Sequence, residues 1–368
     1  MKSRDVYQKL GDHLTKVGQG YPKVDALLEL LHSNLSPQEA KVALGLPIKL
    51  PPLEVEEIDV IARQVKMDPD EVQEILEGLA QRGFVFRGIS KNGNPGYAMI
   101  QLGYGFPQVF FWKGERTPSA ENMAKLLLPV LRDEKSVKKL GGTPKTKTYR
   151  YIPIQQAIPY SLQVVLPYEE MVEIINKVSI IALAHCPCRM MASLSGEREC
   201  PHTLETCLKF NAMARFIIDR GLARQISKDE ALEVLKKTEE EGLVHFVDNC
   251  QGDVQHNCNC CSCCCWSLSA IKGRKVPRDA VMATYFLRTT DTDVCEGCGT
   301  CVDSCPLGVI TMRDDYPVVD ENMCIGCGVC IPSCPSEAAK LKRKEEGLVP
   351  PFNFKDLHRK LLKETWNF

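Results

Sequence analysis

The chain lacks the features that mark exported, membrane-spanning and strongly basic proteins. Its first residues, MKSRDVYQKLGDHL, contain no apolar stretch, so we expect no secretory signal. The longest apolar candidate, VSIIALA at 178–184, is far shorter than the roughly 18 residues that cross a bilayer. The formal net charge of −1 gives no general attraction to nucleic acid or to anionic membranes.

Nucleotide-binding signatures are missing as well. No G-x-G-x-x-G sequence follows an expected strand, and no G-x-x-x-x-G-K-[ST] sequence occurs. The sequence therefore indicates no nicotinamide, flavin or nucleotide site. No Ser/His/Asp or Cys/His set can be singled out as catalytic, because the cysteines are too many.

Cysteine is absent from the first half of the chain and dense in the second. None of the 19 cysteines precedes Cys186. In a secreted protein such density would indicate disulfides. Here no export signal is expected, and the spacings are those of metal ligands. We therefore expect a cytoplasmic, reducing and anaerobic setting in which the thiolates are kept for metal.

Residues 1–104 are expected to form a helical domain that ends in a hairpin. Four segments carry apolar residues at helical spacing, and FVFRGISKNGNPGYAMI has two strand-like runs around a turn rich in Asn and Gly. This order resembles the winged helix-turn-helix fold, which implies DNA binding. The helix expected at 70–82, however, carries four acidic residues and one arginine. Since phosphate contacts need Lys or Arg, we favour a packing or docking module over a redox-sensing DNA-binding regulator.

Residues 105–175 are expected to connect this domain to the cysteine-rich region through a basic loop. No acidic residue separates its cations, which are Lys135, Lys138, Lys139, Lys145, Lys147 and Arg150. Two interpretations remain open. The loop is a solvated connector, or it is a docking patch for an acidic redox partner, because attraction between opposite charges raises the encounter rate.

Two similar cysteine runs lie near the C-terminus. DVCEGCGTCVDSCP at 293–306 and NMCIGCGVCIPSCP at 322–335 each place four cysteines at the same intervals and end on Cys-Pro. Three thiolates on one short loop can reach three corners of a [4Fe–4S] cube, and the glycines let the backbone N–H groups approach the sulfurs. Two complete matches favour this interpretation over zinc or disulfides.

The paired runs resemble bacterial-type ferredoxins with two [4Fe–4S] clusters, over residues 290–340. The resemblance implies a ferredoxin domain at 291–340, one-electron transfer, and a hairpin within GVITMRDDYPVVDEN between the runs. It also implies that the fourth cysteine of each run binds the other cluster. One cluster would then take Cys295, Cys298, Cys301 and Cys334. The other would take Cys324, Cys327, Cys330 and Cys305.

The remaining cysteines lie in an expected cysteine-rich, helical metal-binding domain at 176–290. Six of them fall within the eight residues 258–265 and would cross-link or oxidise unless something held them. Soft thiolates suit iron–sulfur clusters, zinc or Cu(I), and the paired runs downstream favour iron and sulfide. We predict one or two further iron–sulfur clusters. Their candidate ligands are Cys186, Cys188, Cys200, Cys207, Cys258, Cys260, Cys261, Cys263, Cys264 and Cys265.

Two ligand arrangements remain open for this domain. The cysteines of 186–207 could bind one cluster and four from 250–265 another, or one cluster could draw from both segments and leave spare thiols. A non-cubane cluster is conceivable. Arg189 is either a cation that offsets cluster charge or grips an anion, or a member of a surface ion pair. His185 and His202 are further ligand candidates, since His replaces Cys in some clusters.

The whole layout resembles multidomain 4Fe–4S binding proteins of anaerobic bacteria and archaea. We expect an α+β protein with a winged-helix-like N-terminal domain, a helical middle lobe, a ferredoxin-like domain and a helical tail at 341–368. The predicted function is an iron–sulfur electron-transfer protein or subunit that passes single electrons between a redox partner protein and clusters in the middle lobe. The alternative is an iron–sulfur oxidoreductase with a substrate-binding cluster in residues 186–265.

Overall fold

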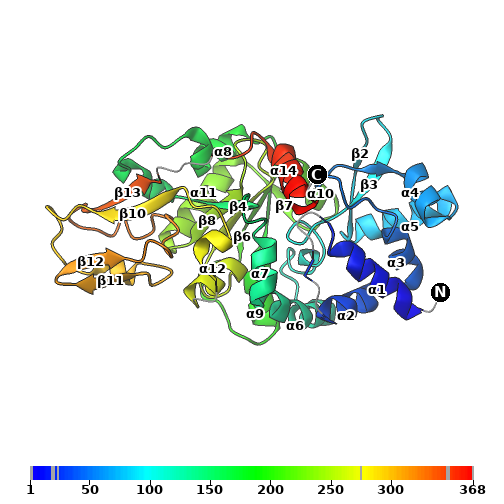
Figure 1. The fold of residues 1–368 in the computed structure, drawn as a ribbon, viewed down its shortest axis with the longest axis horizontal. Coiled ribbons are helices and arrows are strands. Elements are labelled where there is room, and N and C mark those ends of the chain that lie inside the picture. The colour runs from blue at the N-terminus through cyan, green and yellow to red at the C-terminus, as the bar shows by residue number, and fades with distance from the viewer. Residues whose placement is uncertain (1–2, 18–20, 23–24, 274–275, 345–348, 367–368) are drawn as a thin grey trace.

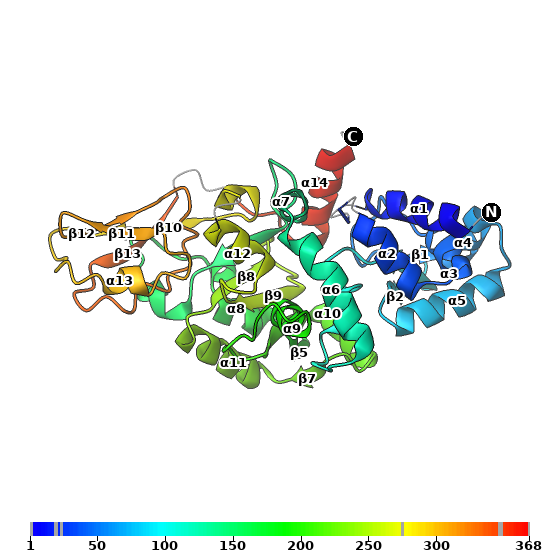
Figure 2. The same ribbon diagram turned by 90° about the horizontal axis from the view of Figure 1, so that it is seen from below.

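Three parts of the chain lie in a row in the computed structural model. The N-terminal helices form one end, the paired cysteine runs form the other, and a mixed region lies between them (Figure 1). A second view shows the same order (Figure 2). The structure describes residues 3–17, 21–22, 25–273, 276–344 and 349–366. The outermost residues of the predicted first and last segments lie outside these ranges. The chain combines helices and sheets, as the predicted α+β class requires.

The N-terminal part is a set of short helices beside a small antiparallel sheet. Its elements are α1 (Ser3–Leu14), α2 (Asp25–Asn34), α3 (Pro37–Ala43), β1 (Glu56–Glu57), α4 (Ile58–Val65), α5 (Pro69–Gln81), β2 (Val85–Ile89) and β3 (Pro95–Met99). Ser36 and Asp68 accept backbone hydrogen bonds at the starts of α3 and α5, as the Ser-Pro and Asp-Pro sequences predict. The sheet has the order β1-β3-β2. The resemblance to a winged helix stays a prediction.

Charged side chains of helix α5 are engaged within this part of the protein. The carboxylate of Glu77 accepts hydrogen bonds from Tyr97 and Arg87, at 2.6 and 2.8 Å. Arg82, the basic residue at the end of the helix, contacts the carboxylate of Glu39 and the carbonyl of Asn34. Because the Arg82 guanidinium makes these contacts within the protein, its position adds no support for DNA binding.

The basic run of the connector does not form one exposed patch. The connector elements are η1 (Gln108–Phe110), α6 (Pro118–Arg132), α7 (Glu134–Leu140), β4 (Tyr149–Ile152), η2 (Gln155–Tyr160), η3 (Pro167–Glu169) and α8 (Met171–Lys177). The basic run lies on α7 and β4 and in the turn between them. Arg150 is fully buried and donates to the carbonyls of Asp248 and Cys250. Lys139 donates to the carbonyl of Thr15 at 2.8 Å. Arg150 therefore cannot belong to a docking patch, because its charge serves backbone carbonyls inside the fold.

The middle of the protein is built on a six-stranded antiparallel sheet, so the prediction of a helical lobe was wrong. The strand order is β4-β8-β9-β6-β5-β7. The further strands are β5 (Ile181–His185), β6 (Glu205–Phe210), β7 (Arg224–Ile226), β8 (Val244–Asp248) and β9 (His256–Cys260). The helices that accompany them are α9 (Pro187–Leu194), α10 (Asn211–Asp219), α11 (Lys228–Glu240) and α12 (Trp266–Lys272), followed by η4 (Arg278–Ala280). Apolar runs of this length do not separate strand from helix by periodicity.

The segment TCLKFNAMARFIIDRG illustrates the error. Its amphipathic pattern predicts a single helix that ends at Gly221, but the segment forms the end of β6 and then α10. Asn211 makes the change of direction with a φ of +50°, a conformation that Asn adopts more readily than most residues. In the next segment, SKDEALEVLKKTEEEG, an N-terminal Ser, an acidic first turn and a final Gly predict a helix, and this helix is present as α11, with Ser227 as its N-cap.

The paired cysteine runs fold as short loops held by two hairpin-like pairs of strands. The elements are β10 (Phe286–Thr290), α13 (Thr300–Asp303), β11 (Ile310–Arg313), β12 (Tyr316–Val319) and β13 (Ala339–Arg343). Strands β11 and β12 form the hairpin that was predicted between the runs. Strands β10 and β13 pair antiparallel and enclose the segment from its two ends. Gly326 has a φ of +63°, and a Cβ there would collide with the carbonyl of Phe286, so this loop position requires glycine.

The last helix, α14 (Phe354–Trp366), packs on the middle region. Leu357 and Leu361 are buried, and the ring of Phe354 lies 5.7 Å from the ring of Tyr104. The amphipathic pattern of the tail predicts this packing. Within the part of the chain that the structure describes, no helix has the length and apolar character that a membrane span requires.

Candidate metal centres

The cysteines of the paired runs form an outer and an inner group. Cys298 is exposed and Cys295 half-buried, whereas Cys324, Cys327 and Cys330 are all buried. The outer cysteines, Cys295 and Cys298, are therefore accessible at least in part, and the inner cysteines lie within the protein.

The fourth cysteine of each run lies beside the other run. A small cavity is lined by the three inner cysteines together with Cys305. Burial, and then repulsion from Cys305 among other thiols, raises the pKa of Cys330 to about 12. Burial also raises the pKa of Cys301, and Cys334 contributes to that rise. Cys305 thus lies with the three inner cysteines, and Cys334 lies near Cys301; the full ligand sets that the ferredoxin resemblance implies stay a prediction.

Arg288 of β10 lies between these two groups. Its side chain is 4% exposed, and its Nη2 donates to the Sγ of Cys301 at 3.5 Å. It also lines the cavity of the inner cysteines, and its buried Nε has no hydrogen-bond partner among the described residues. A buried cation and a spare N–H donor fit a site for anionic clusters. Sequence reasoning missed Arg288, since it precedes the first cysteine run in an ordinary strand sequence.

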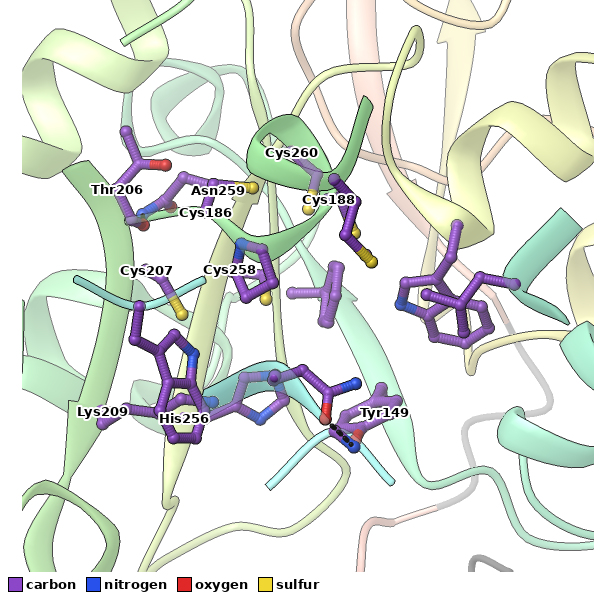
Figure 3. Close-up of a pocket in the computed structure, with 18 of the residues that line it drawn as sticks. Tyr149, Cys186, Cys188, Thr206, Cys207, Lys209, His256, Cys258, Asn259 and Cys260 are labelled. Atoms are coloured by element: carbon purple, nitrogen blue, oxygen red, sulfur yellow. Dashed lines mark hydrogen bonds between the residues drawn. The ribbon is translucent and has the colours of Figure 1, made fainter. Parts of the chain in front are cut away.

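A second cavity, of about 70 Å³, lies in the middle region and is lined by cysteines from both segments (Figure 3). Strand β9 contributes two residues of one face, Cys258 and Cys260, because alternate residues of a strand point the same way. Strand β6 contributes Cys207, and the start of α9 contributes Cys186 and Cys188. Three neighbouring elements thus bring five distant cysteines to one space.

Neighbouring thiols shift one another's pKa, and these interactions connect the five cysteines and include a sixth, Cys265, at the start of α12. They form a continuous series, in which the neighbours are Cys186 with Cys188, Cys188 with Cys265, Cys265 with Cys260, Cys260 with Cys258, and Cys258 with Cys207. A cubane takes four thiolates, so this group contains more thiols than one cubane needs. We refer to these six residues as the cavity cysteines.

Polar and aromatic side chains close the other side of this cavity. Lys209 is buried, and its Nζ lies 5.3 Å from the ring centre of Trp112. Among the described residues it has no carboxylate within ion-pair distance. His256 lies 3.2 Å from the carboxylate of Asp248; although burial opposes its charge, Cys258 and Asp248 raise its pKa. The Nε1 of Trp112 is buried with no hydrogen-bond partner among the described residues.

These polar residues were not found from the sequence, although one signal was present. Lys209 follows Cys207 by two positions. Once the segment is known to be a strand, both side chains must share a face. The helical interpretation hid that relation.

The other candidate ligands of the middle region form a separate, compact group. It contains Cys200 from the loop between α9 and β6, and Cys261, Cys263 and Cys264 from the turn between β9 and α12. Their four sulfurs all lie within 4.8 Å of one another. We refer to these residues as the cysteine tetrad.

This division differs from the first expected ligand arrangement and agrees with the second in that a group draws on both segments. The four cysteines of 186–207 do not stay together, because Cys200 joins the tetrad and the others line the cavity. Both groups draw on both segments. Pairing of β6 with β9, with Leu208 opposite Asn257, is what brings the segments together.

Arg189 lies between the cavity cysteines and the tetrad and is fully buried. It donates to Thr206 Oγ1 at 2.8 Å and to the carbonyl of Asn259 at 2.9 Å. Burial opposes its charge, but Cys186 and Cys261 raise its pKa. The interpretation of Arg189 as a member of a surface ion pair was therefore wrong. The other interpretation, a cation that offsets the charge of thiolates, remains.

The histidine candidates make other contacts. His185 Nδ1 lies 3.2 Å from the carbonyl of Trp112, and His202 lies 3.5 Å from the carboxylate of Glu241. Neither lies in the tetrad or lines the cavity. Their role as cluster ligands stays a prediction without support from these positions.

Tyr151 of β4 lies between the cavity cysteines and the inner ferredoxin-type group. Burial, and then Cys265, Cys260 and Cys327, raise its pKa. The two regions are in direct contact here, because the N–H of Ile154, three residues after Tyr151, donates to the carbonyl of Cys327 at 2.9 Å. One buried side chain thus lies near cysteines of both regions.

Comparison with known families identifies one segment of the chain. Residues 294–338 match a family described as a 4Fe-4S dicluster domain. This segment coincides with the paired runs, so the chain contains a ferredoxin-type 4Fe–4S segment. Comparisons with curated proteins and with solved structures gave no significant match.

Proposed function

We propose that the protein carries single electrons between a redox partner at its ferredoxin-type end and an iron–sulfur centre at the cavity cysteines. The observation that carries this proposal is the order of the thiols. It runs from exposed Cys298 through buried Cys327 and past Tyr151 to Cys265 at the cavity. Iron–sulfur clusters held by these cysteines would supply one-electron oxidation and reduction.

The residues around the thiols support this function. Arg288 and Arg189 place buried positive charge beside each cysteine region, which favours the thiolate form that metals require. Two of the inner ferredoxin-type cysteines, Cys324 and Cys327, are packed in the same apolar core as Cys260 and Cys265. Water is therefore kept from the space between the two regions, and the exposed outer group is left for a partner protein.

The ligand sets follow from the same placement. We assign Cys295, Cys298, Cys301 and Cys334 to the outer cluster. We assign Cys324, Cys327, Cys330 and Cys305 to the inner cluster. The middle centre would be held by a subset of the cavity cysteines or, in a larger cluster, by all of them.

Protein purified without oxygen is expected to contain about twelve irons per chain, from two ferredoxin-type clusters and one four-iron centre. The number exceeds eight because the cavity cysteines provide enough thiolates for a further cluster. Iron and acid-labile sulfide would be measured on the full chain, with EPR after dithionite reduction. A value near eight, with no additional EPR signal, would contradict a cluster at the cavity.

A second candidate function is an oxidoreductase whose substrate binds at the middle centre. It is favoured by buried Lys209, a cation without a carboxylate partner among the described residues, at the wall of a cavity that thiols line. Such a charge fits a small anionic ligand. It equally fits the charge of a cluster, so electron transfer stays the first proposal.

Cyanide separates the two candidates, because it binds an open iron site. If the second is correct, cyanide should change the EPR spectrum of the reduced wild-type protein, and Lys209→Met should weaken that change several-fold through loss of the lysine charge at the cavity wall. Lys209→Arg keeps the charge and serves as the control. A spectrum that cyanide leaves unchanged argues against an open site and for electron transfer alone.

A further inference from the structure

The cysteine tetrad has the dimensions of a site for one metal ion. The Sγ of Cys200 lies 3.8 Å from those of Cys261 and Cys263, and the Sγ atoms of Cys263 and Cys264 are 3.7 Å apart. Four thiolates placed tetrahedrally about 2.3 Å from a zinc ion have their sulfurs about 3.8 Å from one another. The observed separations agree with that tetrahedron before any ion is considered.

A cubane cluster does not fit these distances. Its four thiolates bind four different irons at separate corners, so their sulfurs must lie farther apart than those on a single ion. The protein offers an internal comparison. Across the described residues, the tetrad is the only group of three or more Cys, His, Asp or Glu whose ligand atoms all lie within 4.8 Å. The ferredoxin-type cysteines and the cavity cysteines are spread more widely.

Disulfides do not explain the tetrad either. All four residues are free thiols, and the measured separations are far longer than the roughly 2.05 Å of an S–S bond. Two of the four, Cys261 and Cys264, are buried, and the other two are half-buried. Close, buried thiols without a cation or a bond would be both reactive and mutually repulsive once ionised.

We propose that Cys200, Cys261, Cys263 and Cys264 bind one zinc ion in a closed, four-coordinate site that is separate from the iron–sulfur centres. Zinc is chosen because an all-thiolate tetrahedral site with no open position is typical of structural zinc. This inference goes beyond the electron-transfer function and does not depend on it.

The position of the tetrad gives the ion a structural role. Cys200 lies on the loop between Cys188 of α9 and Cys207 of β6, and the other three lie between Cys260 of β9 and Cys265 of α12. The ion would therefore join the two loops whose ends carry the cavity cysteines. Arg189 also contacts this site, since its guanidinium interacts with the Cys261 thiol and donates to the carbonyl of Asn259.

The test is the metal content of the full chain purified without oxygen. We expect one zinc per chain beside the iron. Cys200→Ser is the variant of choice, because Cys200 is half-buried and stands alone on its loop. It should lose most of the zinc while it keeps the iron and sulfide of the wild type. Cys250→Ser is the matched control, since this buried cysteine belongs to neither group, and it should keep both metals.

A second measurement keeps the inference testable if the variant does not fold. Wild-type protein produced with cobalt in place of zinc should show the visible absorption of tetrahedral Co²⁺ with thiolate charge-transfer bands. Zinc absent from the wild type, or iron and sulfide lost together with Cys200, would overturn the proposal and place the tetrad in an iron–sulfur cluster. A single iron without sulfide at the tetrad would overturn the assignment to zinc.

Discussion

Cys258→Ala is expected to remove the EPR signal and the iron of the middle centre and to leave the two ferredoxin-type clusters intact. Cys258 interacts with Cys207 on one side and Cys260 on the other, and it also attracts His256. Its loss interrupts the series of thiols at strand β9, which also carries Cys260. The iron content should fall by about four per chain.

The measurement is iron, sulfide and EPR on variant and wild type prepared together without oxygen. Cys250→Ala is the control, because it removes a buried thiol from the same region without touching the cavity cysteines. The ferredoxin-type signals supply a second control within each sample. If Cys258→Ala keeps its iron while the ferredoxin-type signals change, the cavity is not the site of the third centre.

The same variant tests whether electrons pass between the ferredoxin-type clusters and the middle centre. Chemical reduction of the ferredoxin-type clusters should still proceed, because their ligands lie in another part of the chain. Electron transfer from these clusters to the middle region should be lost. A variant that still reoxidises its ferredoxin-type clusters through the middle region at the wild-type rate would contradict the proposed path.

The ferredoxin-type segment could be predicted from the sequence because its information is local. Three cysteines on one loop, followed by Cys-Pro, fix ligands, turn and cluster within about a dozen residues. Glycines at 297 and 326 adopt the positive φ that such loops need, and the hairpin between the runs has the expected place. The family match at 294–338 rests on the same local pattern.

The middle region could not be predicted in the same way, because its sites depend on strand pairing. Cys207 and Cys258 are far apart in the chain, and only the pairing of β6 with β9 makes them neighbours. A run such as CNCCSCCC offers no spacing that tells which cysteine belongs to which site. In the structure, the direction of each side chain shows to which site each cysteine belongs. Strand β9 points Cys258 and Cys260 into the cavity, and the turn after it carries three residues to the tetrad.

The burial of three arginines could not be predicted for a related reason; Arg288 was missed altogether, whereas Arg189 and Arg150 were named without their burial. Arg288, Arg189 and Arg150 are ordinary arginines in the sequence, and a single charge is usually solvated. Each becomes significant only through what surrounds it: a cysteine pair for Arg288, two thiol groups for Arg189 and backbone carbonyls for Arg150. Burial is a property of the whole fold, and no local pattern encodes it.

Arg288→Gln is expected to lower the reduction potentials of both ferredoxin-type clusters. The reduced state of a cluster carries one more negative charge than the oxidised state, so a buried cation stabilises the reduced state more. Hydrogen bonds to charged groups contribute roughly 1.5–3 kcal/mol. For one electron this corresponds to about 60–130 mV. The inner cluster should respond as well as the outer one, because Arg288 lowers the pKa of both Cys301 and Cys330.

The potentials would be measured by EPR-monitored redox titration of the full chain, and Arg288→Lys provides the matched control. Lysine keeps the positive charge but cannot reproduce the fork that contacts both Cys301 Sγ and Thr290 Oγ1. Its potentials should therefore lie between those of the wild type and Arg288→Gln. Equal shifts in the Lys and Gln variants would show that the hydrogen bond, and not the charge, sets the potential. A cation this close to two clusters must change their reduction potentials. Unchanged potentials in both variants would therefore contradict the proposed position of the clusters and leave Arg288 only a structural role in the loops.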